Sequence, residues 1–273
     1  MRMPGRLVLL GHPVNHSLSP RMHDAALTAA GIPLRYEALD VEPSAFDETL
    51  DALKAVRAAG NVTVPHKGRM YAACDSLTPL AKRVGAVNVF WIDDTGRLTG
   101  DNSDVGGFGR AVATLLGHEP RDLSVGVLGA GGAAAAVLAA VETWPGCYAH
   151  VFNRTPERAR LLSERFSSVA QPVDDVGVIA GAQLIVNATT IGLHDDEMPI
   201  DPGLLPRDSV VIDLVYRPGE THFVRAVRAR GMRAADGLGM LVEQGALAFE
   251  TWFGVIPNRA RMWEALETRP SAR

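Results

Sequence analysis

The sequence has few of the features that mark secreted or nucleic-acid-binding proteins. It contains only two cysteines, Cys74 and Cys147, and their spacing matches no disulfide framework, metal site or redox motif. Its 27 Lys and Arg residues are nearly balanced by 31 Asp and Glu residues, so the net charge of −4 gives no reason to expect nucleic acid or an anionic membrane as a partner. We therefore expect a cytoplasmic protein that binds a small molecule.

No stretch of the sequence is typical of a signal peptide or a membrane span. Residues 1–10 include a short apolar run but lack the long apolar region and the small-residue cleavage site of a signal peptide. The uncharged stretch 125–141 is interrupted by Gly129, Gly131 and Gly132, which divide it into a strand, a turn and the start of a helix. We expect no membrane segment.

The chain is long enough for two domains, since hydrophobic residues make up 47% of its 273 positions. Strand-like runs alternate with helix-like runs, which predicts an α/β fold. A first helix is predicted from Ser19, as its N-cap, to just before Gly31, and the polar, glycine-rich segment 99–109 predicts a hinge between domains. The predicted strands are 6–10, 34–39, 61–64, 87–91, 125–128, 149–152, 184–186 and 210–214, and the last three predicted helices are 221–229, 240–252 and 258–266.

A dinucleotide-binding motif follows the strand predicted at 125–128. The next residues form a G-x-G-x-x-A turn that opens an alanine-rich helix. The first glycine allows a tight turn, the second lets a pyrophosphate approach the backbone, and free N–H groups at the helix start hold the phosphates. Taken alone, the motif is also compatible with a glycine-rich turn that binds nothing. The predicted cofactor-binding residues of the turn are Gly129, Ala130, Gly131, Gly132 and Ala133.

The residues after the next predicted strand favour NADP over NAD. Asn153, Arg154 and Thr155 stand where an NAD enzyme would carry an acidic residue for the ribose 2′-hydroxyl. The planar guanidinium of Arg154 suits a 2′-phosphate, and its two neighbours offer short hydrogen-bonding groups. The alternative is a solvated arginine without a ligand. We expect NADP, or NADPH in the reduced form, as the cofactor.

Polar residues that suit a small carboxylated substrate precede the dinucleotide motif. Ser17 and Ser19 lie at the start of the first predicted helix, where hydroxyl and N–H groups favour a carboxylate, although Ser19 alone would be an ordinary cap. Lys67 and Asp104 fall at strand ends, where open α/β sheets bind ligands. They are candidates for the acid/base pair that hydride transfer to a ketone requires.

Nine short motifs follow one another along the chain: G-x-P-x-x-H-S-x-S-P, N-V-T-V-P-H-K, G-A-V-N, G-x-N-S-D, G-A-G-G-A, N-R-T, N-A-T, D-L-x-Y and D-G-x-x-M-L-x-x-Q. In this order they resemble the motifs of the shikimate dehydrogenase family. They span essentially the whole sequence. The resemblance implies a substrate-binding α/β domain, residues 1–104 plus 238–273, and a Rossmann-like NADP-binding domain, residues 105–237, with the active-site cleft between them.

The resemblance also implies the reaction, which is the reversible NADP-dependent reduction of 3-dehydroshikimate to shikimate in the chorismate and aromatic amino acid pathway. Protonated Lys67 would give a proton to the developing alkoxide, and Asp104 would orient the hydroxyl and the lysine. No metal is expected, because the N-terminal histidines match no ligand spacing. The implied substrate-binding residues are Ser17, Ser19, Thr63, Asn88, Tyr216 and Gln244, and the further cofactor-binding residues are Thr189, Gly237 and Met240.

The chain departs little from the family pattern. Asp24, Ser103 and Thr190 stand where the family commonly has Asn, Thr and Ser. Two alternatives remain open: a quinate/shikimate dehydrogenase that uses NAD, against which the missing acidic residue at Asn153 argues, and a catalytically idle NADP sensor, against which the catalytic pair argues. The sequence is compatible with a monomer or a homodimer.

Overall fold

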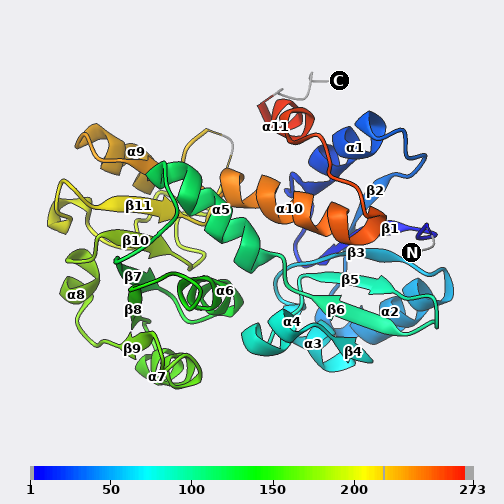
Figure 1. Ribbon diagram of the computed structural model, residues 1–273, viewed down its shortest axis with the longest axis horizontal. Helices are drawn as coiled ribbons and strands as arrows, with labels where there is room; N and C mark the ends of the chain where they lie inside the picture. The colour runs from blue at the N-terminus through cyan, green and yellow to red at the C-terminus, as the bar shows by residue number, and fades with distance from the viewer. Residues whose placement is uncertain (1–2, 218, 268–273) are drawn as a thin grey trace. The chain divides into compact units, whose positions relative to one another are not determined.

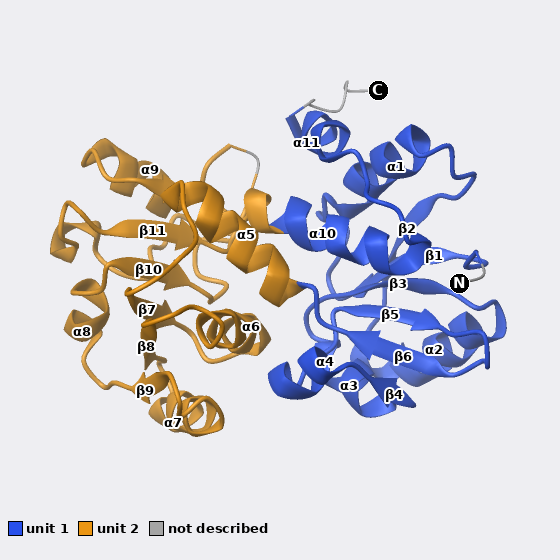
Figure 2. Ribbon diagram, in the orientation of Figure 1, with its two compact units in different colours: residues 1–103, 241–273 blue, residues 104–240 orange. Residues whose placement is uncertain are grey.

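The computed structural model describes residues 3–217 and 219–267 (Figure 1), and the chain divides into two compact units (Figure 2). Unit 1 comprises Met1–Ser103 and Leu241–Arg273, and unit 2 comprises Asp104–Met240. The expected domain boundaries, after residue 104 and before residue 238, lie one and three residues from these limits. The predicted α/β class is confirmed, since each unit contains one sheet together with helices.

Unit 1 contains a six-stranded mixed sheet in the order β2-β1-β3-β5-β6-β4. Its elements are β1 (Leu7–Gly11), α1 (Ser19–Ala29), β2 (Tyr36–Asp40), η1 (Pro43–Ala45), α2 (Phe46–Ala55), β3 (Ala59–Val62), α3 (Lys67–Ala73), β4 (Ser76–Leu77), α4 (Pro79–Val84), β5 (Val89–Ile92), β6 (Leu98–Asp101), most of α10 (Leu238–Phe253) and α11 (Arg259–Glu267). β1 is parallel to β2 and β3, whereas β5 is antiparallel to β3 and β6. The β5–β6 turn contains Gly96 at φ +82°, a left-handed conformation that glycine adopts without strain.

The antiparallel direction of β5 brings four chain segments to one edge of this sheet. Val89, the first residue of β5, pairs with Asn61 near the end of β3 and with Asp101 at the end of β6. β1 ends at the same edge, with Leu10 opposite Val62. The segments that follow β1, β3 and β6 therefore converge with the segment that precedes β5.

The core of unit 1 forms where α2, α3 and α4 pack against the sheet. α2 contributes Phe46, Leu50 and Leu53, which are each at most 3% exposed and recur at the i, i+4, i+7 spacing of one helix face. Each such burial stabilises the fold by about 1.5–3 kcal/mol. The buried residues of this core are Val8, Leu10, Val41, Phe46, Leu50, Leu53, Ala58, Val62, Met70, Ala81, Val87, Phe90, Ile92 and Leu98.

The start of α1 differs from the prediction. The helix begins at Ser19 with Leu18 in the N-cap position and without a side-chain cap, so the prediction that Ser19 caps the helix is wrong. The physical reason is that the Ser17 hydroxyl oxygen already accepts the Ser19 N–H at 3.2 Å. Pro20 in the first turn has no N–H to satisfy.

His23 on α1 is buried in unit 1 between two aromatic rings. Its ring centroid lies 4.3 Å from that of Tyr36, in a stacked arrangement, and 5.3 Å from that of Trp252. Neither ring nitrogen has a partner with hydrogen-bond geometry among the described residues. Burial lowers the pKa of His23 from 6.5 to about 3, and the Asn61 amide opposes only part of that shift. His23 is therefore neutral at physiological pH.

Acidification from pH 7 to 5.5 is expected to remove about 1.3 kcal/mol of stability through His23, because the unfolded chain takes up a proton that the folded state excludes. This contribution is present above the unfolded-state pKa of 6.5 and is lost progressively as the pH falls towards 3. Urea unfolding at both pH values should show it in the wild type and not in His23→Gln. The exposed His118→Gln variant is the control and should keep the wild-type pH dependence. A His23→Gln protein with an unchanged pH dependence would contradict the prediction.

Unit 2 contains a six-stranded parallel sheet in the order β12-β11-β10-β7-β8-β9. Its elements are α5 (Asp104–Leu116), β7 (Ser124–Leu128), α6 (Gly132–Val141), β8 (Tyr148–Phe152), α7 (Pro156–Arg165), β9 (Ala170–Pro172), α8 (Val176–Ala180), β10 (Leu184–Asn187), η2 (Pro202–Leu204), β11 (Val210–Asp213), α9 (His222–Ala229) and β12 (Ala234–Ala235). Two runs of three strands diverge from the central pair β7 and β10, which is the Rossmann-like order. The point where the strand order reverses is where such sheets bind dinucleotides.

The eight predicted strands are all present, and each end lies within two residues of its predicted position. Segment 99–109, predicted as a polar connection, consists mostly of regular secondary structure, since β6 ends at Asp101 and α5 begins at Asp104. α5 was not predicted because it contains three glycines, which disfavour a helix. Its buried face, which includes Phe108 and Val112, stabilises the helix despite them.

Candidate active site

The connection between β3 and α3 carries Thr63 and Lys67. The Thr63 N–H donates to the Leu10 carbonyl at 2.8 Å, and the Lys67 carbonyl accepts the Val87 N–H at 3.1 Å. Between them, His66 is fully buried with its Nε2 2.6 Å from the Val41 carbonyl oxygen. Thr63 and Lys67 are both partly buried. Backbone contacts on both sides therefore position these two side chains at the edge where the strands converge.

Asn88, Ser103 and Gln244 form a buried group of polar side chains that we call the carboxamide cluster. They are 2%, 6% and 8% exposed, respectively. The Asn88 Nδ2 lies 3.1 Å from the Ser103 Oγ and 3.4 Å from the Gln244 Oε1. The structure thus brings together two residues predicted to bind the substrate, although 156 positions separate them along the chain.

Asn61 and Tyr36 support this cluster and were missed by the sequence analysis as functional residues. The Tyr36 hydroxyl donates to the Asn61 Oδ1 at 2.7 Å, and the Asn61 Nδ2 donates to the Asn88 carbonyl at 3.1 Å. Asn61 is 5% exposed within an otherwise apolar strand. An amide in such a strand is the signal that could have identified it, because buried polar groups need partners.

The remaining predicted residues of this region lie on the neighbouring segments. Ser17 is partly buried and Ser19 is 6% exposed, both in the segment that follows β1. Asp104 is 5% exposed and is the first residue of α5, where a carboxylate is favoured by the helix dipole. It follows Asn102, whose Nδ2 donates to the Ala86 carbonyl at 2.9 Å.

The glycine-rich turn of unit 2 has the geometry of a phosphate-binding turn. Gly129 has φ +112°, and a Cβ there would lie 2.9 Å from the Ala188 carbonyl oxygen, so only glycine fits. α6 begins at Gly132 with Gly131 as its N-cap and no side-chain cap, and both glycines are exposed. Ala130 and Ala133, predicted with them, are partly buried in the same turn. The N–H groups of the first turn of α6 are available to hold a pyrophosphate.

Asn153, Arg154 and Thr155 follow β8, the strand next to β7. The Asn153 Nδ2 donates to the Thr155 carbonyl at 2.9 Å, which shapes this short segment before α7. Arg154 and Thr155 are exposed. Leu128 at the end of β7 is paired with Phe152 at the end of β8, so the arginine and the glycine turn leave the same edge of the sheet. These residues fit a dinucleotide that carries a 2′-phosphate.

The ends of β10 and β11 are held by a buried carboxylate. Asp213 Oδ1 accepts from the Asn187 Nδ2 at 2.8 Å and from the Val215 N–H at 3.1 Å, and its Oδ2 accepts from the Thr221 hydroxyl at 2.7 Å. Asn187 in turn accepts from the Thr189 N–H and hydroxyl at 3.1 and 2.6 Å. Burial is the main cause that raises the pKa of Asp213. This network positions Thr189, a predicted cofactor-binding residue.

Tyr216 and Gly237 lie together on the segments beyond β11 and β12. The Gly237 N–H donates to the Val215 carbonyl at 3.1 Å, and a Cβ at position 237 would lie 2.3 Å from the Leu214 carbonyl oxygen. The same position is 3.3 Å from the Tyr216 ring. Met240, three residues further on, is 9% exposed. Asp104 and Tyr216 belong to unit 2, whereas the other predicted substrate-binding and catalytic residues belong to unit 1.

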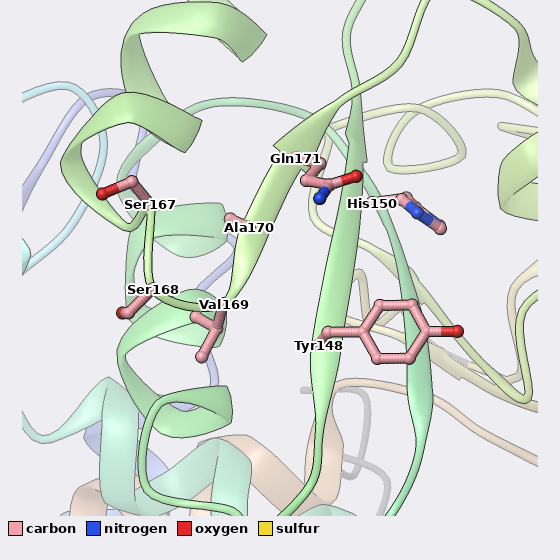
Figure 3. Close-up of a pocket in the computed structure, with 7 residues that line it drawn as sticks. All are labelled: Tyr148, His150, Ser167, Ser168, Val169, Ala170 and Gln171. Atoms are coloured by element: carbon pink, nitrogen blue, oxygen red, sulfur yellow. The ribbon is translucent and has the colours of Figure 1, made fainter.

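A pocket elsewhere in unit 2 coincides with none of these residues. It lies along β8 and β9 (Figure 3), and it begins beside Tyr148, the first residue of β8, rather than at the carboxyl end of the strand. It contains no carboxylate, lysine or arginine. The residues that line it are Tyr148, His150, Ser167, Ser168, Val169, Ala170 and Gln171.

Residues 3–217 and 219–267 contain neither a metal centre nor a membrane helix. No group of three or more His, Cys, Asp or Glu side chains there is arranged to hold a metal ion. Within the same residues, no helix combines the length and apolar composition needed to cross a membrane.

Fold and site together define a two-unit α/β oxidoreductase that binds a dinucleotide. Comparison with known proteins specifies it further. Residues 9–90 match the model of the shikimate dehydrogenase substrate binding domain, and residues 237–267 match that of the shikimate 5′-dehydrogenase C-terminal domain. A shikimate dehydrogenase (NADP(+)) of Thermus thermophilus is 42% identical over 261 residues, covering 95% of this chain and 97% of that protein. The chain belongs to the shikimate dehydrogenase family.

Solved structures agree with this assignment. A shikimate 5-dehydrogenase of Thermus thermophilus, crystallised with NADP(H) and shikimate, matches with a TM-score of 0.87 and 41% identity, covering 95% of this chain and 97% of that one. A quinate dehydrogenase from Corynebacterium glutamicum in complex with NAD also matches, with a TM-score of 0.86 and 31% identity over 95% and 97% of the two chains. The fold is therefore shared by a shikimate 5-dehydrogenase crystallised with NADP(H) and by a quinate dehydrogenase in complex with NAD.

Proposed function

We propose that this protein is an NADP-dependent shikimate dehydrogenase, which interconverts 3-dehydroshikimate and shikimate in the biosynthesis of chorismate and the aromatic amino acids. The observation that carries the proposal is the carboxamide cluster beside Thr63 and Lys67, at the edge where the segments of unit 1 converge. Buried amides and hydroxyls suit the ring hydroxyls of a small cyclic substrate, because a buried polar group left unpaired is costly.

The substrate residues divide by chemistry. Ser17 and Ser19 bind the carboxylate, since hydroxyls and the first N–H groups of α1 favour an anion. Thr63, Asn88 and Gln244 bind the ring hydroxyls, and Tyr216 is a further substrate-binding residue. These assignments follow the family motifs.

Lys67 and Asp104 form the catalytic pair. Lys67 donates a proton to the alkoxide that develops at the reduced carbonyl and takes it back in the reverse direction, and Asp104 orients the hydroxyl and the lysine. Bound NADPH supplies the hydride. Gly129 to Ala133 would hold its pyrophosphate and Asn153 to Thr155 its 2′-phosphate. Gly237 and Met240 would border its nicotinamide, and Thr189 would contact the cofactor.

We place the enzyme in the cytoplasm as a monomer or homodimer with no membrane or nucleic-acid partner. The near balance of charges and the absence of a nucleic-acid motif support this part of the proposal. Gel filtration with light scattering determines the oligomeric state.

NADP reduction followed at 340 nm tests the reaction, with shikimate and quinate each offered with NADP and with NAD. We expect turnover with shikimate and NADP to exceed every other pair, because Asn153 stands where an NAD enzyme has a carboxylate and Arg154 offers a guanidinium to the 2′-phosphate. Turnover mainly with quinate or with NAD would overturn the specificity and leave the reaction class. No turnover with any pair would overturn the proposed function.

A further inference from the structure

Ser103 lies between the two carboxamides of the cluster and is in contact with both. Its backbone N–H donates to the Asn88 Oδ1 at 2.7 Å, and its hydroxyl accepts from the Asn88 Nδ2 at 3.1 Å. The hydroxyl hydrogen has two acceptors at 3.4 Å, the Asn88 Oδ1 and the Gln244 Oε1. Ser103 thus links a residue that precedes β5 to one on α10.

These contacts permit one orientation for each amide. A backbone N–H can only donate, so the Asn88 oxygen must face the Ser103 N–H and its nitrogen must face the Ser103 Oγ and the Gln244 Oε1. A carbonyl can only accept, so the Gln244 nitrogen faces the Leu241 carbonyl, to which it donates at 2.9 Å. Turning either amide by 180° would place two donors or two acceptors against each other.

We propose that Ser103 is a positioning residue that holds Asn88 and Gln244 in this orientation for the ring hydroxyls of the substrate. One N–H of the Gln244 Nε2 donates to Leu241, and the second is left to donate to a substrate hydroxyl. Without the Ser103 hydroxyl, Asn88 loses one acceptor and the Gln244 oxygen loses one donor. The Ser103 N–H and the Leu241 carbonyl still set which end of each amide faces them, but each side chain loses a hydrogen bond that holds its position, so substrate binding weakens. This inference rests on the proposed function.

The test compares Ser103→Ala with Ser103→Thr, which retains a hydroxyl at the same position. Ser103→Ala is expected to raise the KM for shikimate about three- to tenfold, the effect of losing one hydrogen bond between uncharged groups. The kcat and the KM for NADP should stay within about twofold, since the Ser103 hydroxyl bonds to Asn88 and Gln244, to which the proposed function assigns neither proton transfer nor cofactor binding. Ser103→Thr should restore the KM to within about twofold of the wild type.

Ser209→Ala is the matched control. Ser209 is 4% exposed in unit 2, and its hydroxyl donates to the Ala182 carbonyl at 2.9 Å, so the substitution also removes a buried hydroxyl and one hydrogen bond. Its KM for shikimate should equal that of the wild type. Analogues of shikimate that lack one ring hydroxyl give a second readout. The analogue without the hydroxyl bound by Gln244 should show a smaller difference in affinity between wild type and Ser103→Ala than shikimate does, because only the contribution of Asn88 remains.

The kinetic results distinguish a failure of the positioning role of Ser103 from a failure of the proposed function. An active wild type whose Ser103→Ala variant keeps its KM for shikimate overturns the positioning role alone. The same follows if the KM for NADP rises as much as that for shikimate, or if every deoxy analogue preserves the full difference between the two proteins. A wild type that does not turn over shikimate overturns the proposed function, and this inference with it.

Discussion

Lys67→Ala is expected to lower kcat for shikimate oxidation by about 10²–10⁴-fold, the usual cost of removing a general acid/base. Lys67 is the first residue of α3, and the Val87 N–H donates to its carbonyl at 3.1 Å, so the residue lies at the edge of the unit 1 sheet where the substrate residues lie. The loss should fall on kcat far more than on the KM for shikimate, because proton transfer is made only in the transition state.

Steady-state kinetics at 340 nm checks this result, with Lys82→Ala as the matched control. Lys82 is an exposed lysine on α4 of the same unit, and its replacement should leave kcat unchanged. Circular dichroism of both variants establishes that they are folded. An unchanged kcat in a folded Lys67→Ala protein would remove Lys67 from the catalytic role.

Arg154→Ala is expected to raise the KM for NADP by about 10- to 100-fold, the equivalent of one charge-assisted hydrogen bond to a phosphate. The KM for NAD should stay nearly constant, because NAD lacks the 2′-phosphate that the guanidinium would bind. The physical basis is the position of Arg154, which is exposed after β8 at the edge of the sheet that also carries the glycine turn.

Comparing the KM for NADP with the KM for NAD distinguishes recognition of the 2′-phosphate from a general effect on the fold. Arg121→Ala removes another exposed arginine of unit 2, on the segment that precedes β7, and should leave both KM values unchanged. If Arg154→Ala raises the KM for NAD as much as that for NADP, the arginine does not recognise the 2′-phosphate.

Much of the fold could be predicted because its signals are local. The strand at 125–128 and its glycine turn lie within one short segment, so the backbone conformation of Gly129 follows from the residues themselves. The short strands β4, β9 and β12 could not be predicted, since two or three residues carry no periodicity and pair only where a neighbouring strand is present. The start of α1 was misplaced because the sequence offers two serines and only the folded chain selects which oxygen accepts.

In the candidate site, too, some residues could be identified from local motifs, whereas their contacts could not. The sequence motifs identified Asn88 and Gln244 separately, but nothing local indicates that Ser103 joins them or that Asn61 supports them. The contacts of Asn61 and Ser103 with Asn88 depend on the antiparallel register of β3, β5 and β6, which is set by strand pairing across the sheet. The contact with Gln244 also requires α10 to lie beside these segments.

By itself, the sequence determined the α/β class, the dinucleotide turn and the chemical types of the candidate residues, because turn geometry, strand periodicity and side-chain functional groups are properties of short segments. Only the tertiary structure decided the direction of β5, the burial that keeps His23 neutral, and the orientation of the two carboxamides. The reason is that hydrogen-bond direction and desolvation depend on groups distant in the chain, which come together only when the sheet is formed.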